Sequence, residues 1–151
     1  MNFTPARKEP VDNRYQYEKV TRFMNKQLVS LSPIENAFDA MDFLLEKRIS
    51  GAPVLDDRGH MIGIITEKDF LKMILDRAYN NHPVRGTMVK DYMTTEITTV
   101  SPDMDLLDVA QMFLRSPYKR FPVVENGKLL GLVSRRDILK AALLVKHTSW
   151  K

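Results

Sequence analysis

The chain contains the same pattern twice. Gly63-Ile64-Ile65-Thr66-Glu67-Lys68-Asp69 reappears 68 residues later as Gly131-Leu132-Val133-Ser134-Arg135-Arg136-Asp137. A long internal repeat constrains the fold before any single residue does, because each copy is one supersecondary unit that buries its apolar face against the next copy. Neither half is long enough to bury a sheet alone. We therefore expect two repeats packed about a pseudo-twofold axis.

Each repeat is predicted to run strand, helix, strand, strand, helix, which is an α/β (α+β) arrangement. In the first repeat, three short apolar runs at residues 28–31, 52–55 and 61–66 are typical of strands. The turn residues Asp56-Asp57-Arg58-Gly59 join the last two runs into a hairpin. The second repeat has the same order with a shorter hairpin turn.

Helix signals fall between and after these strands. Ser32-Pro33-Ile34-Glu35 has the spacing of a capping box with proline at the first helical position, so we expect a helix from there to about Lys47. Thr66 and Asp69 have the same spacing and can cap a second helix, which Asn80 and the residues after it end. The capping role alone would explain this Thr and Asp, and the same holds for their copies in the second repeat.

The composition excludes several classes of protein. The 151 residues include no cysteine, which removes disulfides and thiolate chemistry and fits a reducing cytoplasm. No apolar run approaches the roughly 18 residues of a membrane span. Charged residues interrupt the stretch from Met1 to Val20, so we expect no secretory signal there. We expect a cytoplasmic protein that neither crosses nor enters a membrane.

Catalytic signatures are missing from the sequence. It has no glycine-rich phosphate loop, no cysteine nucleophile and no Gly-x-Ser-x-Gly turn. His60, His82 and His147 are isolated, which argues against a metal site. We therefore predict neither an enzyme nor a metal centre.

The paired pattern resembles the tandem cystathionine-β-synthase (CBS) domain family, whose two-repeat unit is called a Bateman module. The resemblance rests on Ser-Pro before a helix, on apolar-Pro-Val in a strand, and on Gly-apolar-x-apolar-(Thr/Ser)-x-x-Asp, each present in both halves. It covers about residues 20–145 and implies a stand-alone module. The predicted parts are an N-terminal arm (1–19), CBS repeat 1 (20–79), a linker (80–87), CBS repeat 2 (88–146) and a C-terminal tail (147–151).

The resemblance implies a ligand sensor with two clefts between the repeats. Many relatives bind AMP, ADP, ATP or S-adenosylmethionine as a regulatory ligand, and none of these would act here as a catalytic cofactor. The first cleft would contain Ile64, Thr66, Asp69, Thr95, Ile97, Tyr118, Lys119 and Arg120. The second cleft would contain Lys26, Leu28, Ile49, Ser50, Gly51, Leu132, Ser134 and Asp137.

The two predicted clefts differ in charge. Arg120 offers phosphate a planar fork of donors, whereas the second cleft has Gly51 at the corresponding position. We therefore expect the Asp69 cleft to prefer a nucleotide, and the Asp137 cleft to bind more weakly or to take a less charged adenosyl ligand. Arg135 and Arg136 weaken this distinction, because either can turn toward a phosphate in the second cleft. Tyr118 fits base stacking and a core or dimer contact equally well.

Other functions stay open beside the sensor. A constitutive interaction or dimerisation module with vestigial clefts is the main alternative, and a nucleic-acid binder with steep salt dependence is the disfavoured one. The sensor is expected to form a homodimer and to act on an unidentified protein effector. The nucleic-acid alternative rests on a basic C-terminal stretch with Arg135, Arg136, Lys140, Lys146 and Lys151 against Asp137, which is also typical of a solvated helical face.

Overall fold

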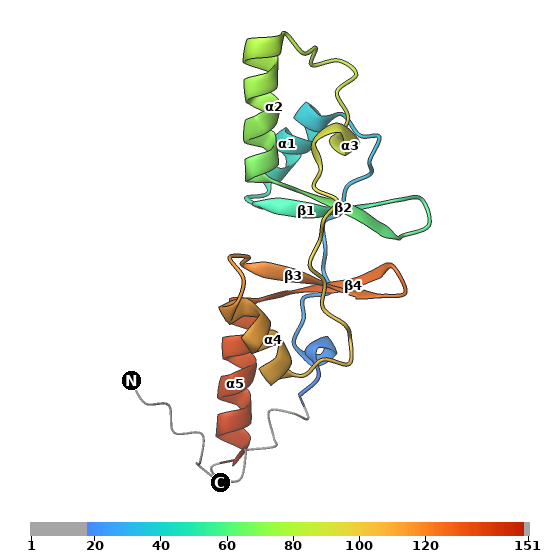
Figure 1. The fold of residues 1–151 in the computed structure, drawn as a ribbon. Helices are drawn as coiled ribbons and strands as arrows, with labels where there is room; N and C mark the ends of the chain where they lie inside the picture. The colour runs from blue at the N-terminus through green and yellow to red at the C-terminus, as the bar shows by residue number, and fades with distance from the viewer. Residues whose placement is uncertain (1–17, 150–151) are drawn as a thin grey trace.

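The computed structural model describes residues 18–149 and shows two stacked halves (Figure 1). A two-stranded hairpin from each half lies at the middle of the molecule, and the helices lie toward its two outer ends (Figure 1). Most of the predicted N-terminal arm and the end of the predicted C-terminal tail lie outside the described residues.

The first half contains helix α1 (Ala37–Glu46), strands β1 (Gly51–Leu55) and β2 (Met61–Thr66), and helix α2 (Glu67–Asn80). The second half contains helix α4 (Leu106–Leu114), strands β3 (Arg120–Glu125) and β4 (Lys128–Ser134), and helix α5 (Arg135–Ser149). The strands of each hairpin are antiparallel, and each helix that follows a hairpin begins where the second strand ends. The hairpins and α2 confirm the sequence prediction.

Two short helices each pack against the half that is formed by the other repeat. The 3₁₀-helix η2 (Val20–Arg22) precedes the first repeat, yet Val20 is fully buried in the core of the second half. Helix α3 (Val89–Tyr92) precedes the second repeat, and Val89 is buried in the core of the first half (Figure 1). Each hydrophobic core is therefore completed by a residue from the start of the other repeat, so the two halves depend on each other.

The predicted first strand of each repeat is reduced to a single bridge. Leu31 pairs with Val54 in parallel, and the copy of this bridge joins Val100 to Val123. The chain before Leu31 crosses from one half to the other, because Asn25 pairs with the second hairpin. A segment whose two ends pair with different sheets cannot form a continuous ladder with either one.

Helix α1 begins later than its capping-box signal predicts. Its N-cap is Asn36, whose side chain accepts hydrogen bonds from the backbone N–H groups of Phe38 and Asp39 at 2.9 and 3.0 Å. The stretch from Ser32 to Glu35 forms a turn, in which the Ser32 N–H donates to the Glu35 carboxylate at 3.2 Å. The carbonyls of residues 33 and 35 accept N–H groups of α3 instead of starting α1. The predicted helix start at Ser32 was wrong because the hydrogen bonds to α3 join segments that are far apart in the sequence.

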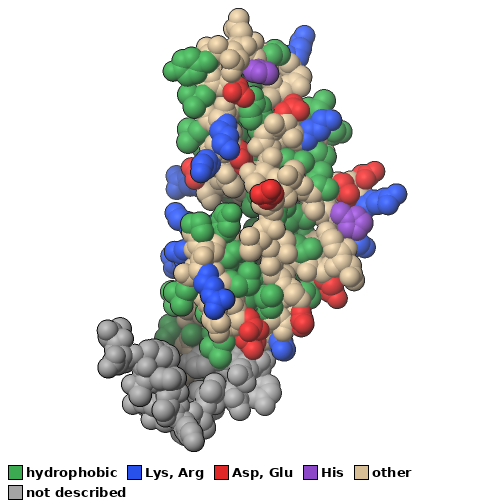
Figure 2. Space-filling view, in the orientation of Figure 1, with side chains coloured by type: hydrophobic (Ala, Val, Ile, Leu, Met, Phe, Trp, Pro, Cys, Tyr) green, Lys and Arg blue, Asp and Glu red, His purple; other side chains and the backbone are tan. Residues whose placement is uncertain are grey.

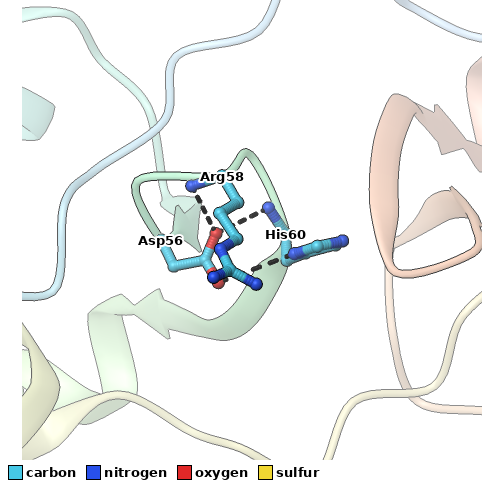
Figure 3. Close-up of polar contacts among 3 residues, drawn as sticks. All are labelled: Asp56, Arg58 and His60. Atoms are coloured by element: carbon cyan, nitrogen blue, oxygen red, sulfur yellow. Dashed lines mark hydrogen bonds and ion pairs between the residues drawn. The ribbon is translucent and has the colours of Figure 1, made fainter.

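The turn of the first hairpin is organised by one carboxylate (Figure 3). Asp56 accepts hydrogen bonds from the backbone N–H groups of Arg58 and His60, both at 2.9 Å. The hydrogen bond from His60 is the main cause that holds the pKa of Asp56 below its usual value. The N–H of Met61 donates to the carbonyl of Gly127 at 2.9 Å, so the two hairpin turns touch. Within the described residues no cluster of potential metal ligands is present.

Replacing Gly131 with alanine is expected to destabilise the protein by about 1–3 kcal/mol, the usual cost of overpacking. A Cβ at this position would lie 2.7 Å from Sδ of Met24 and 2.9 Å from the carbonyl oxygen of Asn25. That carbonyl accepts from Leu132, so the backbone pairing that joins the halves would have to shift. Chemical denaturation measures the loss, and Ser30→Ala at an exposed position serves as the control, with a change within about 0.5 kcal/mol. Equal effects of the two variants would contradict the tight approach.

Candidate functional site

A cavity of about 310 Å³ lies between the two halves. In the space-filling view the halves are separated by a notch on the side where α2 and α5 begin, and Lys and Arg side chains flank it (Figure 2). The cavity wall combines a crossing segment and the start of β1 from the first half with parts of β3, β4 and α5 from the second. The lining residues are Asn25, Gln27, Leu28, Val29, Ile49, Gly51, Arg120, Leu132, Ser134 and Asp137.

Asp137 presents a partly buried carboxylate to this cavity. Its Oδ2 accepts the N–H of Ser134 at 2.8 Å, and its own N–H donates to Oγ of Ser134 at 3.1 Å. This reciprocal pair caps the start of α5, as the spacing predicts. Among the residues that the structure describes, no donor reaches the other oxygen, Oδ1. Capping and ligand binding are therefore compatible at Asp137.

Arg120 lines the same cavity as Asp137. It is the direct cross-strand partner of Ser134, so it lies at the end of the second hairpin where α5 begins. The sequence predicts Arg120 in the cleft of Asp69, whereas the structure places it in the wall of the cavity that Asp137 lines. Gly51, its equivalent in the first repeat, lines the same cavity, which shows that both positions lie close to the pseudo-twofold axis. For a residue near that axis, the direction of its side chain decides which of the two clefts the side chain lines. The sequence does not encode that direction.

Most residues expected around Asp137 are brought together. Leu28, Ile49, Gly51, Leu132 and Ser134 join it in the cavity wall, whereas Lys26 and Ser50 are exposed and outside the wall. Asn25, Gln27 and Val29 were missed. The internal repeat could have pointed to Asn25, because Met24-Asn25 and Met93-Thr94 are equivalent positions of the two repeats. Asn25 is the residue of this pair that bonds to the second hairpin.

Asp69 has a different environment from Asp137. Its side chain is only 4% exposed. Oδ2 accepts the N–H of Thr66 at 2.9 Å and its hydroxyl at 3.2 Å, while Oδ1 accepts the hydroxyl of Thr94 at 3.0 Å. Thr94 was not among the predicted site residues, although it is adjacent to one of them.

The other residues predicted for the Asp69 cleft do not all contact Asp69. Ile64 exchanges backbone hydrogen bonds with Thr94 and is thereby close to Asp69. Tyr118 is 52% exposed and packs edge-on against Phe121, with ring centroids 6.2 Å apart. In the described part of the chain no hydrogen bond joins Asp69 to the remaining members, which are Thr95, Ile97, Lys119 and Arg120.

The arginine at the start of α5 is held away from the cavity. Arg135 donates to the carbonyl of Ser116 at 3.4 Å, and its guanidinium lies 5.9 Å from the ring centroid of Phe113. Neither Arg135 nor Arg136 lines the cavity. The cationic side chain in its wall is therefore Arg120.

Two α/β repeats that exchange their first segments and enclose a cavity define a paired-repeat module. The CBS domain family model matches residues 20–76 and 89–144, and the chain belongs to the CBS domain family. None of the described helices is long and apolar enough to span a membrane.

The chain is similar to relatives of several kinds. It is 30% identical to the protein MJ1225 of Methanocaldococcus jannaschii over 82% of this chain and 42% of that protein. It is 32% identical to the A-adding tRNA nucleotidyltransferase of Aquifex aeolicus, over 85% of this chain and 15% of the enzyme. The crystal structure of CBSX2 in complex with AMP matches with a TM-score of 0.73 at 31% identity, over 85% of this chain and 98% of that one. CBSX2 is a chloroplastic protein of Arabidopsis thaliana, and this chain spans 59% of its full length. The chain thus covers less than two thirds of these full-length relatives.

Asp69→Ala is expected to destabilise the fold more than Asp137→Ala. Removing the buried carboxylate of Asp69 leaves three donor groups without their acceptor, which costs about 2–4 kcal/mol. Removing Asp137 takes an acceptor from one backbone donor at a helix start, which costs about 1 kcal/mol. Urea unfolding of the two variants gives the difference. Equal losses would contradict the asymmetry of the two carboxylates.

Proposed function

We propose that this chain is a regulatory module that binds an adenosine-containing nucleotide in the Asp137 cavity. The observation that carries the proposal is that Asp137, whose Oδ2 accepts the N–H of Ser134, lines the same interface cavity as Arg120. The volume of about 310 Å³ is in the range of small-molecule sites. The AMP complex of CBSX2 supports the same ligand class for this chain.

Each part of a nucleotide has a matching group in the cavity. The Asp137 carboxylate accepts hydrogen bonds from ribose hydroxyls. The Arg120 guanidinium binds phosphate through two parallel N–H groups. Leu28, Ile49 and Leu132 provide apolar surface for the adenine face. This distribution favours AMP, ADP or ATP over S-adenosylmethionine, which carries no phosphate.

The proposal moves the nucleotide from the cleft of Asp69, where the sequence suggested it, to the cleft of Asp137. The reason is Arg120, whose side chain lines the Asp137 cavity. The expectation of a weaker or less charged ligand at Asp137 rested on the absence of a phosphate-binding group there. We therefore propose that the Asp137 cleft binds the nucleotide.

A nucleotide in this cavity contacts both halves at once. Gly51 and the crossing segment belong to the first half, while Ser134 and Asp137 belong to the second. A ligand shifts the packing of the halves by as much as its affinity differs between the two arrangements. We propose that a protein effector reads this shift, so the output lies outside the chain and catalysis is no part of it.

AMP is expected to raise the melting temperature of the wild type by several degrees. Saturation at one hundred times the dissociation constant adds about 2.7 kcal/mol, and at about 2–4 °C per kcal/mol this moves the melting temperature of a chain of this size by about 5–11 °C. Asp137→Ala and Arg120→Ala are expected to remove most of the shift, while Lys119→Ala, an exposed neighbour outside the cavity wall, keeps it. No shift with AMP, ADP or ATP would refute the nucleotide function.

Homodimerisation is the second proposal, and it also covers the alternative of a constitutive interaction module. Leu71 and Leu75 on α2 are 60% and 54% exposed, and their equivalents on α5, Leu139 and Leu143, are 64% and 55% exposed. Matching apolar faces on pseudo-twofold-related helices can pair with a second copy of the chain in a closed arrangement. We propose a second copy as the group that covers them.

Leu75→Glu combined with Leu143→Glu is expected to convert the dimer into a monomer, because the new charges would be buried at the contact. Sedimentation velocity at micromolar concentration measures the change. The control combines Lys72→Glu with Lys140→Glu, which introduces the same residue at equivalent exposed positions on the same helices. A wild-type monomer at this concentration would refute the dimer, independently of nucleotide binding.

A further inference from the structure

Asn25 and Thr94 occupy equivalent positions in the two repeats. The N–H of Asn25 donates to the carbonyl of Leu132 at 2.7 Å, and the N–H of Leu132 donates back at 3.0 Å. Thr94 and Ile64 exchange the same two hydrogen bonds at 2.7 and 2.9 Å. The backbone therefore places each side chain in the same way beside the carboxylate that follows the strand.

The side chains of Thr94 and Asn25 make different hydrogen bonds from these equivalent positions. The hydroxyl of Thr94 donates to Oδ1 of Asp69 at 3.0 Å. The amide oxygen of Asn25 instead accepts the backbone N–H of Gln27 at 3.0 Å, and Asn25 lines the cavity with Asp137. Among the described residues, no hydrogen bond joins the side chain of Asn25 to Asp137.

The result is an unequal pair of carboxylates. Asp69 accepts three donors and is nearly inaccessible, with both oxygens engaged. Asp137 accepts one backbone N–H through Oδ2. A ribose hydroxyl that approaches Oδ1 of Asp137 meets an available acceptor. At Asp69 the same hydroxyl would approach an oxygen that already accepts from Thr94, in a side chain that is almost completely buried.

We propose that Thr94 determines specificity between the two clefts, because its hydroxyl closes Asp69 to nucleotide and limits the module to one nucleotide per chain. This inference rests on the proposed function for the identity of the ligand. The closure itself rests on the Asp69–Thr94 hydrogen bond and on the burial of the Asp69 side chain. The position of Arg120 in the Asp137 cavity acts in the same direction, since it gives the open carboxylate the phosphate-binding group.

Titration calorimetry of the full chain with AMP tests the closure. The wild type is expected to bind one AMP. Thr94→Val, which keeps the shape and removes the donor, is expected to bind a second AMP that Asp69→Ala removes again. Thr94→Ser keeps a hydroxyl and is the control, which is expected to bind one AMP.

Asn25→Thr copies the closure into the other repeat. It is expected to weaken AMP binding at least about tenfold, which is the worth of a hydrogen bond to a charged group.

The outcomes separate the closure from the nucleotide function. Two AMP molecules on the wild type, or one on both the wild type and Thr94→Val, would overturn the closure and leave the function intact. If the wild type binds no AMP, the function fails by itself, and a ligand-free double-mutant cycle of Thr94→Val with Asp69→Ala decides whether Thr94 closes on Asp69. Non-additivity of at least about threefold in the unfolding equilibrium constant supports it, and additivity overturns it.

Discussion

The structure depends on the two segments that cross between the repeats. Each brings a methionine and a polar residue against a strand glycine of the other half, where the methionine sulfur takes the space that a Cβ would need. The backbone then pairs at Asn25 with Leu132 and at Thr94 with Ile64. Because these contacts join the halves, they also fix the interface cavity and the position of each capping carboxylate beside it.

The same crossing makes the two clefts unequal. A backbone that is nearly symmetric holds different side chains at equivalent positions, which are Asn25 and Thr94 in one pair and Gly51 and Arg120 in the other. The carboxylate of Asp69 is buried inside the fold, whereas Asp137 lines a cavity whose wall also contains Arg120. Differences at a few side chains are therefore enough to give two equivalent carboxylates different surroundings.

The sequence predicted the parts of this fold that depend on local signals. The hairpins and helix α2 follow from apolar alternation, turn residues and the capping pair of Thr66 and Asp69. The start of α1, the loss of the first strand and the exchange of η2 and α3 depend on contacts between distant segments, which no local pattern encodes. The domain boundaries 20–79 and 88–146 stay predictions. Residue types predicted a carboxylate at the start of α2 and of α5, but the place of Arg120 in the wall of the Asp137 cavity and the hydrogen bond from Thr94 to Asp69 required coordinates.

The most direct test of the account is a nuclear magnetic resonance titration of the labelled protein with AMP. The backbone N–H signals of Asn25, Gly51 and Ser134 are expected to shift, because these residues line the Asp137 cavity. The N–H signals of Thr66 and Asp69 are expected to stay in place. Shifts at Thr66 and Asp69 without shifts at Ser134 would contradict the account, because they would place the nucleotide in the closed cleft.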